Sequence, residues 1–137
     1  MIRSIISGIL LLFGLLIGCS KSKPEKKTLT VQPPSEMAVL MHAMEENALQ
    51  WKAAFTEDAP TPSAFPELDL LYTADLTPGF ERDEFFIKSA DSYTKAYEEF
   101  VSEPTIKGHN LIVANCITCH QQKCTGPLVR IEKLKIK

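Results

Sequence analysis

Mostly apolar residues recur at alternating steps of four and three along three separate segments of the chain. The stripes are Met37, Met41, Met44, Ala48, Trp51 and Phe55, then Phe86, Ala90, Tyr93, Tyr97 and Phe100, and finally Ile106, Asn110, Val113, Ile117 and His120. Such steps place side chains on one face of an α-helix, and that face must be buried against another element. The sequence therefore predicts an all-α fold, an antiparallel four-helix bundle with a short second helix and an extended C-terminal tail.

Capping and helix-breaking residues predict where these helices begin and end. Ser35 suits an N-cap, Pro104 is tolerated in a first helical turn, and Gly126-Pro127 stops a helix. The predicted helices cover residues 35–56, 67–76, 82–102 and 104–122.

The last ten residues are harder to interpret. Residues 128–137 alternate apolar and charged, mostly basic, side chains, which suits an exposed strand or an extended arm. The spacing of Ile131 and Leu134 also suits a helical turn, so the sequence leaves both conformations open.

The first 18 residues have the features of a bacterial export signal. Arg3 supplies positive charge, and the apolar run that follows is shorter than the about 20 residues that a membrane-spanning helix needs. The run ends in Leu16-Ile17-Gly18-Cys19, which resembles the lipobox of bacterial lipoproteins. This resemblance implies acylation of Cys19 and a lipid-anchored chain on the periplasmic side of the cell envelope, with Ser20 favouring the outer membrane. In the alternative, the signal is an ordinary one and Cys19 has no special role.

Composition and charge divide and restrict the remainder. Residues 19–34, the Cys and a Lys-, Ser-, Thr- and Pro-rich stretch, read as a flexible tether, and residues 35–137 as one folded domain. The chain has 15 Lys and Arg against 17 Asp and Glu, without a basic face. A nucleic-acid partner is therefore not expected.

One motif carries clear chemistry, the C-x-x-C-H run Cys116-Ile117-Thr118-Cys119-His120. On a helix, positions three and four apart share one face. Two thiols can then form thioether bonds to the vinyl groups along one edge of a porphyrin, while His120 becomes the proximal iron ligand. Such attachment occurs outside the bacterial inner membrane, so the export signal and the motif support each other.

The motif therefore predicts one covalently bound haem c, and three other interpretations of the cysteines are alternatives to it. A thioredoxin-like dithiol needs a strand–helix–strand context, which the sequence around the motif lacks. A zinc site needs four ligands, and Cys116, Cys119, His120 and Cys124 offer the right types but crowd into one helix and turn. A structural disulfide is the third alternative.

A C-x-x-C-H motif near the end of a helical bundle resembles the class II c-type cytochromes, which include cytochrome c prime and its low-spin relatives. The resemblance covers residues 35–123, but only Cys116, Cys119 and His120 match a specific motif. It implies that four antiparallel helices enclose the haem. The fourth helix would carry the motif, and the first would reach over the opposite haem face.

The same resemblance suggests the sixth iron ligand. In the low-spin relatives a Met near the start of the first helix binds the iron, which points to Met41, with Met44 and Met37 on the same helix face as rivals. Methionines at this spacing also serve as core filler. The chain departs from the family in its short second helix and in continuing well beyond the motif. It also has Gln121-Gln122-Lys123-Cys124 in the turn after His120, where the family often has an Arg.

Three further residues of types that bind metals or haem lie near the motif or the methionines in the sequence or on the same helices. His42 lies about 100° around the helix from Met41 and is expected to face solvent. His109 lies roughly 16 Å from His120 along the same helix, too far to share its iron. Cys124 is the one cysteine that neither acylation nor haem attachment would use. The sequence leaves three interpretations of it open: a small buried residue, a cysteine that pairs between chains, or a modulator of the haem edge.

The expected function is single-electron transfer through a His/Met-ligated iron, with an unidentified redox partner and a membrane anchor at Cys19. The alternatives are a five-coordinate haem protein that binds NO or CO and an accessory haem subunit of a membrane redox complex. No acid–base or nucleophile constellation accompanies the motif, so an enzyme is not expected. The oligomeric state, including a homodimer, stays open.

Overall fold

The computed structural model describes residues 32–137, which form one compact unit. The predicted signal peptide, Cys19 and most of the predicted tether lie outside the described residues. Within residues 32–137, none of the helices combines the length and the apolar character that crossing a bilayer requires.

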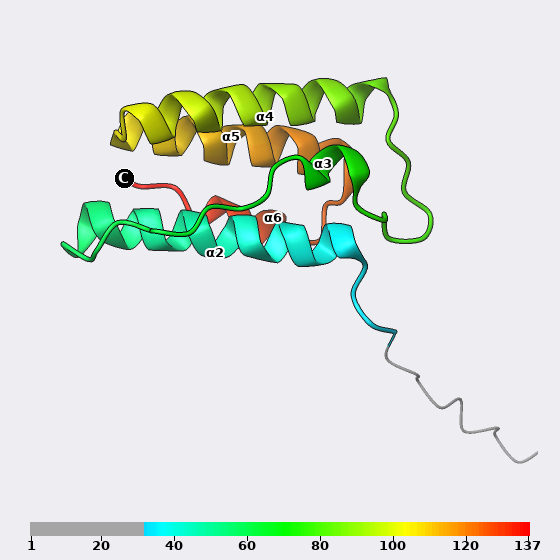
Figure 1. Ribbon diagram of the computed structural model, residues 1–137, viewed down its shortest axis with the longest axis horizontal. Helices are drawn as coiled ribbons and strands as arrows, with labels where there is room; N and C mark the ends of the chain where they lie inside the picture. The colour runs from blue at the N-terminus through cyan, green and yellow to red at the C-terminus, as the bar shows by residue number, and fades with distance from the viewer. Residues whose placement is uncertain (1–31) are drawn as a thin grey trace, which may run out of the picture. The chain divides into compact units, whose positions relative to one another are not determined.

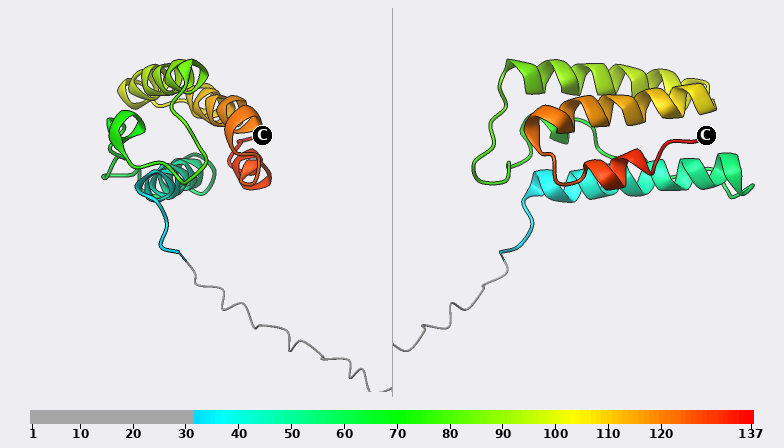
Figure 2. Two further views of the ribbon diagram at one scale, coloured as in Figure 1. Left: turned by 90° about the vertical axis from the view of Figure 1, so that its right-hand side faces the viewer. Right: turned by 180° about the vertical axis from the view of Figure 1, so that it is seen from behind.

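The described part of the chain is all-α, as predicted, and contains no strand. Its three long helices are α2 (Glu36–Thr56), α4 (Glu84–Ser102) and α5 (Ile106–Lys123), and its two short ones are α3 (Leu70–Thr73) and α6 (Leu128–Glu132). Figure 1 shows the long helices lying side by side, with α2 and α5 running in opposite directions. Seen end on, α4, α5, α6, α2 and α3 follow one another around the domain (Figure 2). The arrangement is therefore a helical bundle with short elements between its long helices.

Side-chain caps set the starts of the long helices. Ser35, Asp83 and Thr105 each accept a hydrogen bond from the backbone N–H three residues later, which satisfies a donor that the first turn leaves free. The first helix was predicted to begin at this cap. The other two begin two residues later than predicted, because Asp83 and Thr105 rather than Arg82 and Pro104 supply the capping oxygen.

The segment between α2 and α4 is less helical than predicted. Only Leu70–Thr73 forms a helix within the predicted range 67–76. The Arg82 side chain donates hydrogen bonds to the carbonyl groups of Leu71 and Ala74, which lie at the end of this turn. These bonds satisfy backbone acceptors that a longer helix would have used internally.

The prediction of an extended C-terminal tail was wrong for its first half. Residues 128–132 form α6, and the chain then passes through a turn before its last three residues. The physical reason is burial: Ile131, Leu134 and Ile136 are 7%, 3% and 8% exposed. A helix followed by a turn brings all three to the interior, whereas a detached arm would leave them in water.

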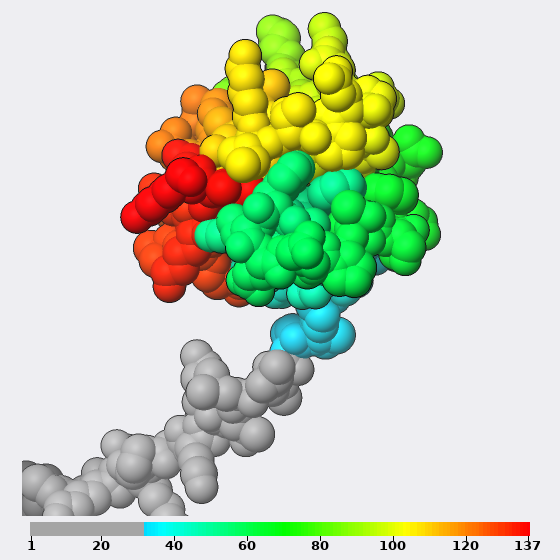
Figure 3. All heavy atoms as spheres, turned by 90° about the vertical axis from the view of Figure 1, so that its left-hand side faces the viewer, coloured from blue at the N-terminus to red at the C-terminus, as the bar shows by residue number. Residues whose placement is uncertain are grey.

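Polar groups of α2 and α5 hold the tail in this position. His109 Nε2 lies 2.9 Å from the Leu134 carbonyl oxygen, and Asn110 exchanges two hydrogen bonds with the backbone of Ile136, at 2.8 and 2.9 Å. Lys52 Nζ donates to the carbonyl oxygens of Lys133 and Lys135. In the space-filling view the C-terminal residues lie closely against the rest of the domain (Figure 3).

His109 should make the domain sensitive to mild acid. It is fully buried, and desolvation lowers the pKa of its imidazole below the usual 6.5, against the hydrogen bond to Leu134. A group with a lowered folded pKa contributes stability above its unfolded pKa, and this contribution is lost as the pH falls below that value. We expect the free energy of unfolding, measured with urea, to fall between about pH 7.5 and pH 5. The fall should be smaller in His109→Gln, and an equal fall in both proteins would contradict this assignment.

Candidate functional site

The three motif residues face one cavity. Cys116, Cys119 and His120, on the last two turns of α5, line a space of about 280 Å³, near the lower end of the range for small-molecule sites. The same cavity is lined by Met37, Met41 and Met44 from α2 and by residues of the loop before α4 and of the C-terminal segment. Apolar side chains predominate, among them Phe86, Tyr93, Ile112, Val113, Ile131 and Leu134.

Cys116, Cys119 and Cys124 are free thiols, and the setting of the first two keeps them protonated. Burial, with a smaller contribution from the charge of Cys119, raises the pKa of the Cys116 thiol to about 12. Burial is also the main cause that raises the pKa of Cys119. A thioredoxin-like dithiol needs the opposite shift, because the thiolate is the attacking species. The pKa values of these thiols therefore do not resemble those of a redox-active dithiol. The location of the motif, at the end of α5, also differs from the strand–helix–strand context of a thioredoxin-like dithiol.

The zinc interpretation also finds no support in the geometry. Within residues 32–137, no three His, Cys, Asp or Glu side chains come together in a way that could hold a metal ion. Cys124, the fourth ligand of the zinc interpretation, instead contributes its backbone carbonyl to a hydrogen bond with His120. Its thiol is half-buried and lines the cavity beside the motif.

The His120 imidazole is oriented by its own helix end. Its Nδ1 lies 2.8 Å from the carbonyl oxygen of Cys124. Because a carbonyl oxygen only accepts, Nδ1 carries the proton and donates it. The lone pair of Nε2 is therefore available to bind a metal ion. A ring nitrogen fixed in this way is typical of metal-ligating histidines.

The register of α2 against α5 places the methionines relative to His120. The rings of Phe55 on α2 and His109 on α5 meet edge-on, with centroids 6.3 Å apart. Along α2, Met44 precedes Phe55 by about three helical turns. Along α5, His120 follows His109 by the same offset. Since α2 and α5 are antiparallel, Met44 lies at the level of His120, and Met41 lies about one turn nearer the start of α2.

No protein-family model matches this chain, and no curated protein or solved structure is significantly similar to it.

The other sequence-predicted residues take distinct places. His42 is largely exposed at the edge of the cavity, with a side chain that is 66% accessible. His109 is fully buried and bonded to Leu134, away from the cavity. Lys123 lines the cavity and forms an ion pair with Asp83, the cap of α4.

Sequence reasoning missed the contribution of the C-terminal segment. Pro127, Arg130, Ile131 and Leu134 all line the cavity, and Arg130 forms an ion pair with Glu45 of α2. The three-residue spacing of Ile131 and Leu134 was the one available signal, since it matches a buried helical turn.

Proposed function

We propose that this chain is a mono-haem c-type cytochrome that carries single electrons on the periplasmic side of the cell envelope. One observation carries the proposal: both motif thiols, the motif histidine and three methionines from another helix line the same cavity. These groups are the thioether donors and the axial ligands that a low-spin haem c requires. The motif and the methionines belong to different helices, so their meeting at one cavity supports the proposal beyond the motif itself.

The residues present fit the group. Cys116 and Cys119 would hold it through two thioether bonds, and both are unpaired thiols, as this attachment needs. His120 would supply the proximal ligand through Nε2, with its ring orientation set by the Cys124 carbonyl. When bound, haem iron supplies a one-electron couple between Fe(III) and Fe(II).

The chain's own contribution is to exclude water and to hold the ligands still. Ile112 and Val113 are each 1% exposed, and Tyr93 is buried beside Cys116, so the side of the cavity nearest the motif is lined by buried side chains. A mainly apolar site with fixed ligands changes little between two oxidation states, and its low polarity helps set the reduction potential.

The architecture supports a place near the class II cytochromes. The three long helices with α3 would correspond to an antiparallel four-helix bundle with one shortened member, and α6 would close the side next to α5. An acylated Cys19 would keep the domain at a membrane surface, most simply the outer membrane. The redox partner has no signature in the described residues.

The mainly apolar lining favours one alternative, a five-coordinate haem protein that binds NO or CO. In that case the methionines would pack without binding iron, and the distal position would stay open to a small apolar gas. The spin state of the oxidised iron separates the two functions. Low-spin iron with a near-infrared Met-to-iron band supports the electron carrier, and high-spin iron that binds CO readily supports the gas-binding protein.

The sixth ligand is testable with three single substitutions. The family resemblance points to Met41, and the helix register to Met44. We expect either Met41→Ala or Met44→Ala to turn low-spin iron high-spin and to abolish the near-infrared band, with the haem still attached. Met37→Ala is the control, because Met37 lies furthest from the level of His120. A low-spin spectrum in both of the first two variants would exclude methionine ligation from this part of α2.

A further inference from the structure

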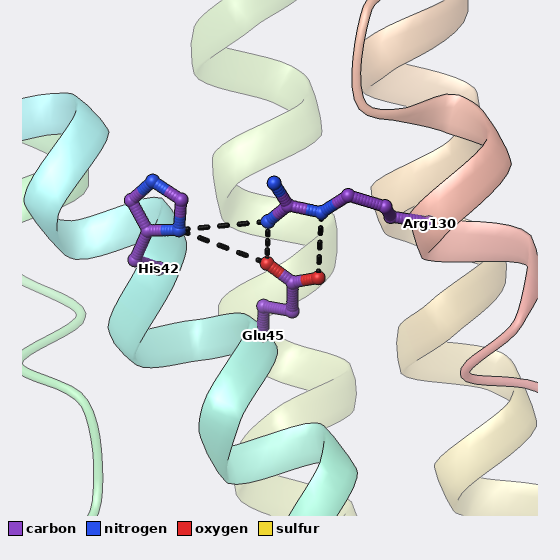
Figure 4. Close-up of polar contacts among 3 residues, drawn as sticks. All are labelled: His42, Glu45 and Arg130. Atoms are coloured by element: carbon purple, nitrogen blue, oxygen red, sulfur yellow. Dashed lines mark hydrogen bonds and ion pairs between the residues drawn. The ribbon is translucent and has the colours of Figure 1, made fainter.

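Arg130 is a fixed cation at the edge of an apolar cavity. It lies on α6, lines the same cavity as the motif, and its side chain is 54% exposed. Its guanidinium forms a two-pronged contact with Glu45 of α2, in which Nε donates to Oε1 at 2.9 Å and Nη2 donates to Oε2. Figure 4 shows the two side chains meeting in this fork, with the His42 ring beside them.

The contact with Glu45 leaves part of the guanidinium unused. Arginine has five N–H donors, and the fork occupies two of them. Within residues 32–137 the one further contact is a long approach of Nη2 to His42 Nδ1, at 3.5 Å. Nη1 makes no hydrogen bond to any described residue, so Glu45 holds the group in place while its outer donors stay available to a second acceptor.

Few other cations could serve the cavity. Besides His120, the proposed iron ligand, the other basic side chains in its lining are His42 and Lys123, and the Lys123 ammonium forms an ion pair with Asp83. Lys52, Lys133 and Lys135 lie nearby on α2 and the C-terminal segment but do not line the cavity. An anion that entered this cavity would therefore find its best donor group at Arg130.

We propose that Arg130 binds a carboxylate of the group held in the cavity, with Glu45 as the residue that positions it. This inference rests on the proposed function, in which the carboxylate is a propionate of haem c. A porphyrin joined to α5 through its vinyl groups carries its two propionates on the other side of the ring, so their partner must come from a different element. The C-terminal segment, which continues beyond the motif, supplies that partner, and the bidentate geometry of guanidinium suits a carboxylate.

Resonance Raman spectroscopy of the matured holoprotein tests this assignment, because the propionate bending band responds to hydrogen bonds at the carboxylate. We expect the band to shift in Arg130→Gln, to shift less in Arg130→Lys, which keeps the charge but loses the fork, and to broaden or shift in Glu45→Gln. Lys52→Gln is the matched control. Lys52 holds the same C-terminal segment through two carbonyl groups but does not line the cavity, so its loss should leave the band unchanged.

The outcomes separate this inference from the proposed function. A wild-type protein without haem bands would overturn the proposed function and this inference with it. A normal haem spectrum whose propionate band is the same in wild type, Arg130→Gln and Glu45→Gln would overturn only the role of Arg130. Equal shifts in Arg130→Gln and Lys52→Gln would also overturn it, since they would show a general loosening of the C-terminal segment.

Discussion

Replacing Cys116 and Cys119 together with alanine should abolish covalent haem attachment and leave the helical bundle folded. Each thiol is proposed to form one thioether bond, so either single variant should keep one bond and show a shifted pyridine haemochrome band. The double variant should release all of its haem into acidified acetone. Far-ultraviolet circular dichroism checks the fold, which we expect to survive because each change removes only a sulfur atom from a half-buried side chain.

Cys124→Ala is the matched control for this experiment. Cys124 is also a half-buried thiol that lines the cavity, but it lies four residues after His120, outside the motif. It should keep both thioether bonds. Haem that stays covalently attached in the double variant, or that is lost in Cys124→Ala, would contradict the assignment of the two bonds.

Phe100→Ala should cause the largest loss of stability of any single substitution considered for this domain. Phe100 is 2% exposed and contacts the rings of Trp51, Tyr97 and His109, with the Trp51 ring edge-on at a centroid distance of 4.9 Å. Truncating a buried Phe loses its transfer free energy and leaves a cavity, at a cost of about 3–5 kcal/mol. Single domains are stable by only about 5–15 kcal/mol, so this loss is a large part of the total.

Phe65→Ala provides the comparison for Phe100→Ala. The chemical change is the same, but the Phe65 side chain is 49% exposed. Urea unfolding should show a loss of less than about 1 kcal/mol for this variant, as is usual for surface positions. Equal losses in the two variants would mean that Phe100 is not at the centre of the core.

The long helices could be predicted from the sequence because their signals are local and repeated. The stripes from Met37 to Phe55 and from Phe86 to Phe100 span several turns each, and the buried residues of α2 and α4 largely follow them. The short elements had no such repetition. The end of α3 depends on hydrogen bonds from Arg82, and the path of the tail depends on His109, Asn110 and Lys52, which are distant in sequence.

The candidate site likewise has residues that the sequence could predict and residues that it could not. Cys116, Cys119 and His120 lie within five residues of one another, so helix geometry alone puts them on one face. The methionines of α2 share a face as well, but the helix period cannot rank them, and only the register against α5 distinguishes Met44 from Met41. The contact between Glu45 and Arg130 joins residues 85 positions apart, and no local pattern links them.

Covalent haem attachment is tested most directly by the intact mass and the pyridine haemochrome spectrum of the chain, purified after expression with the c-type haem attachment machinery. We expect a mass increased by one haem that persists after denaturation. We also expect a haemochrome band at the position of a porphyrin with two saturated vinyl positions. A colourless protein, properly exported and folded, whose mass shows no added porphyrin would contradict covalent haem attachment.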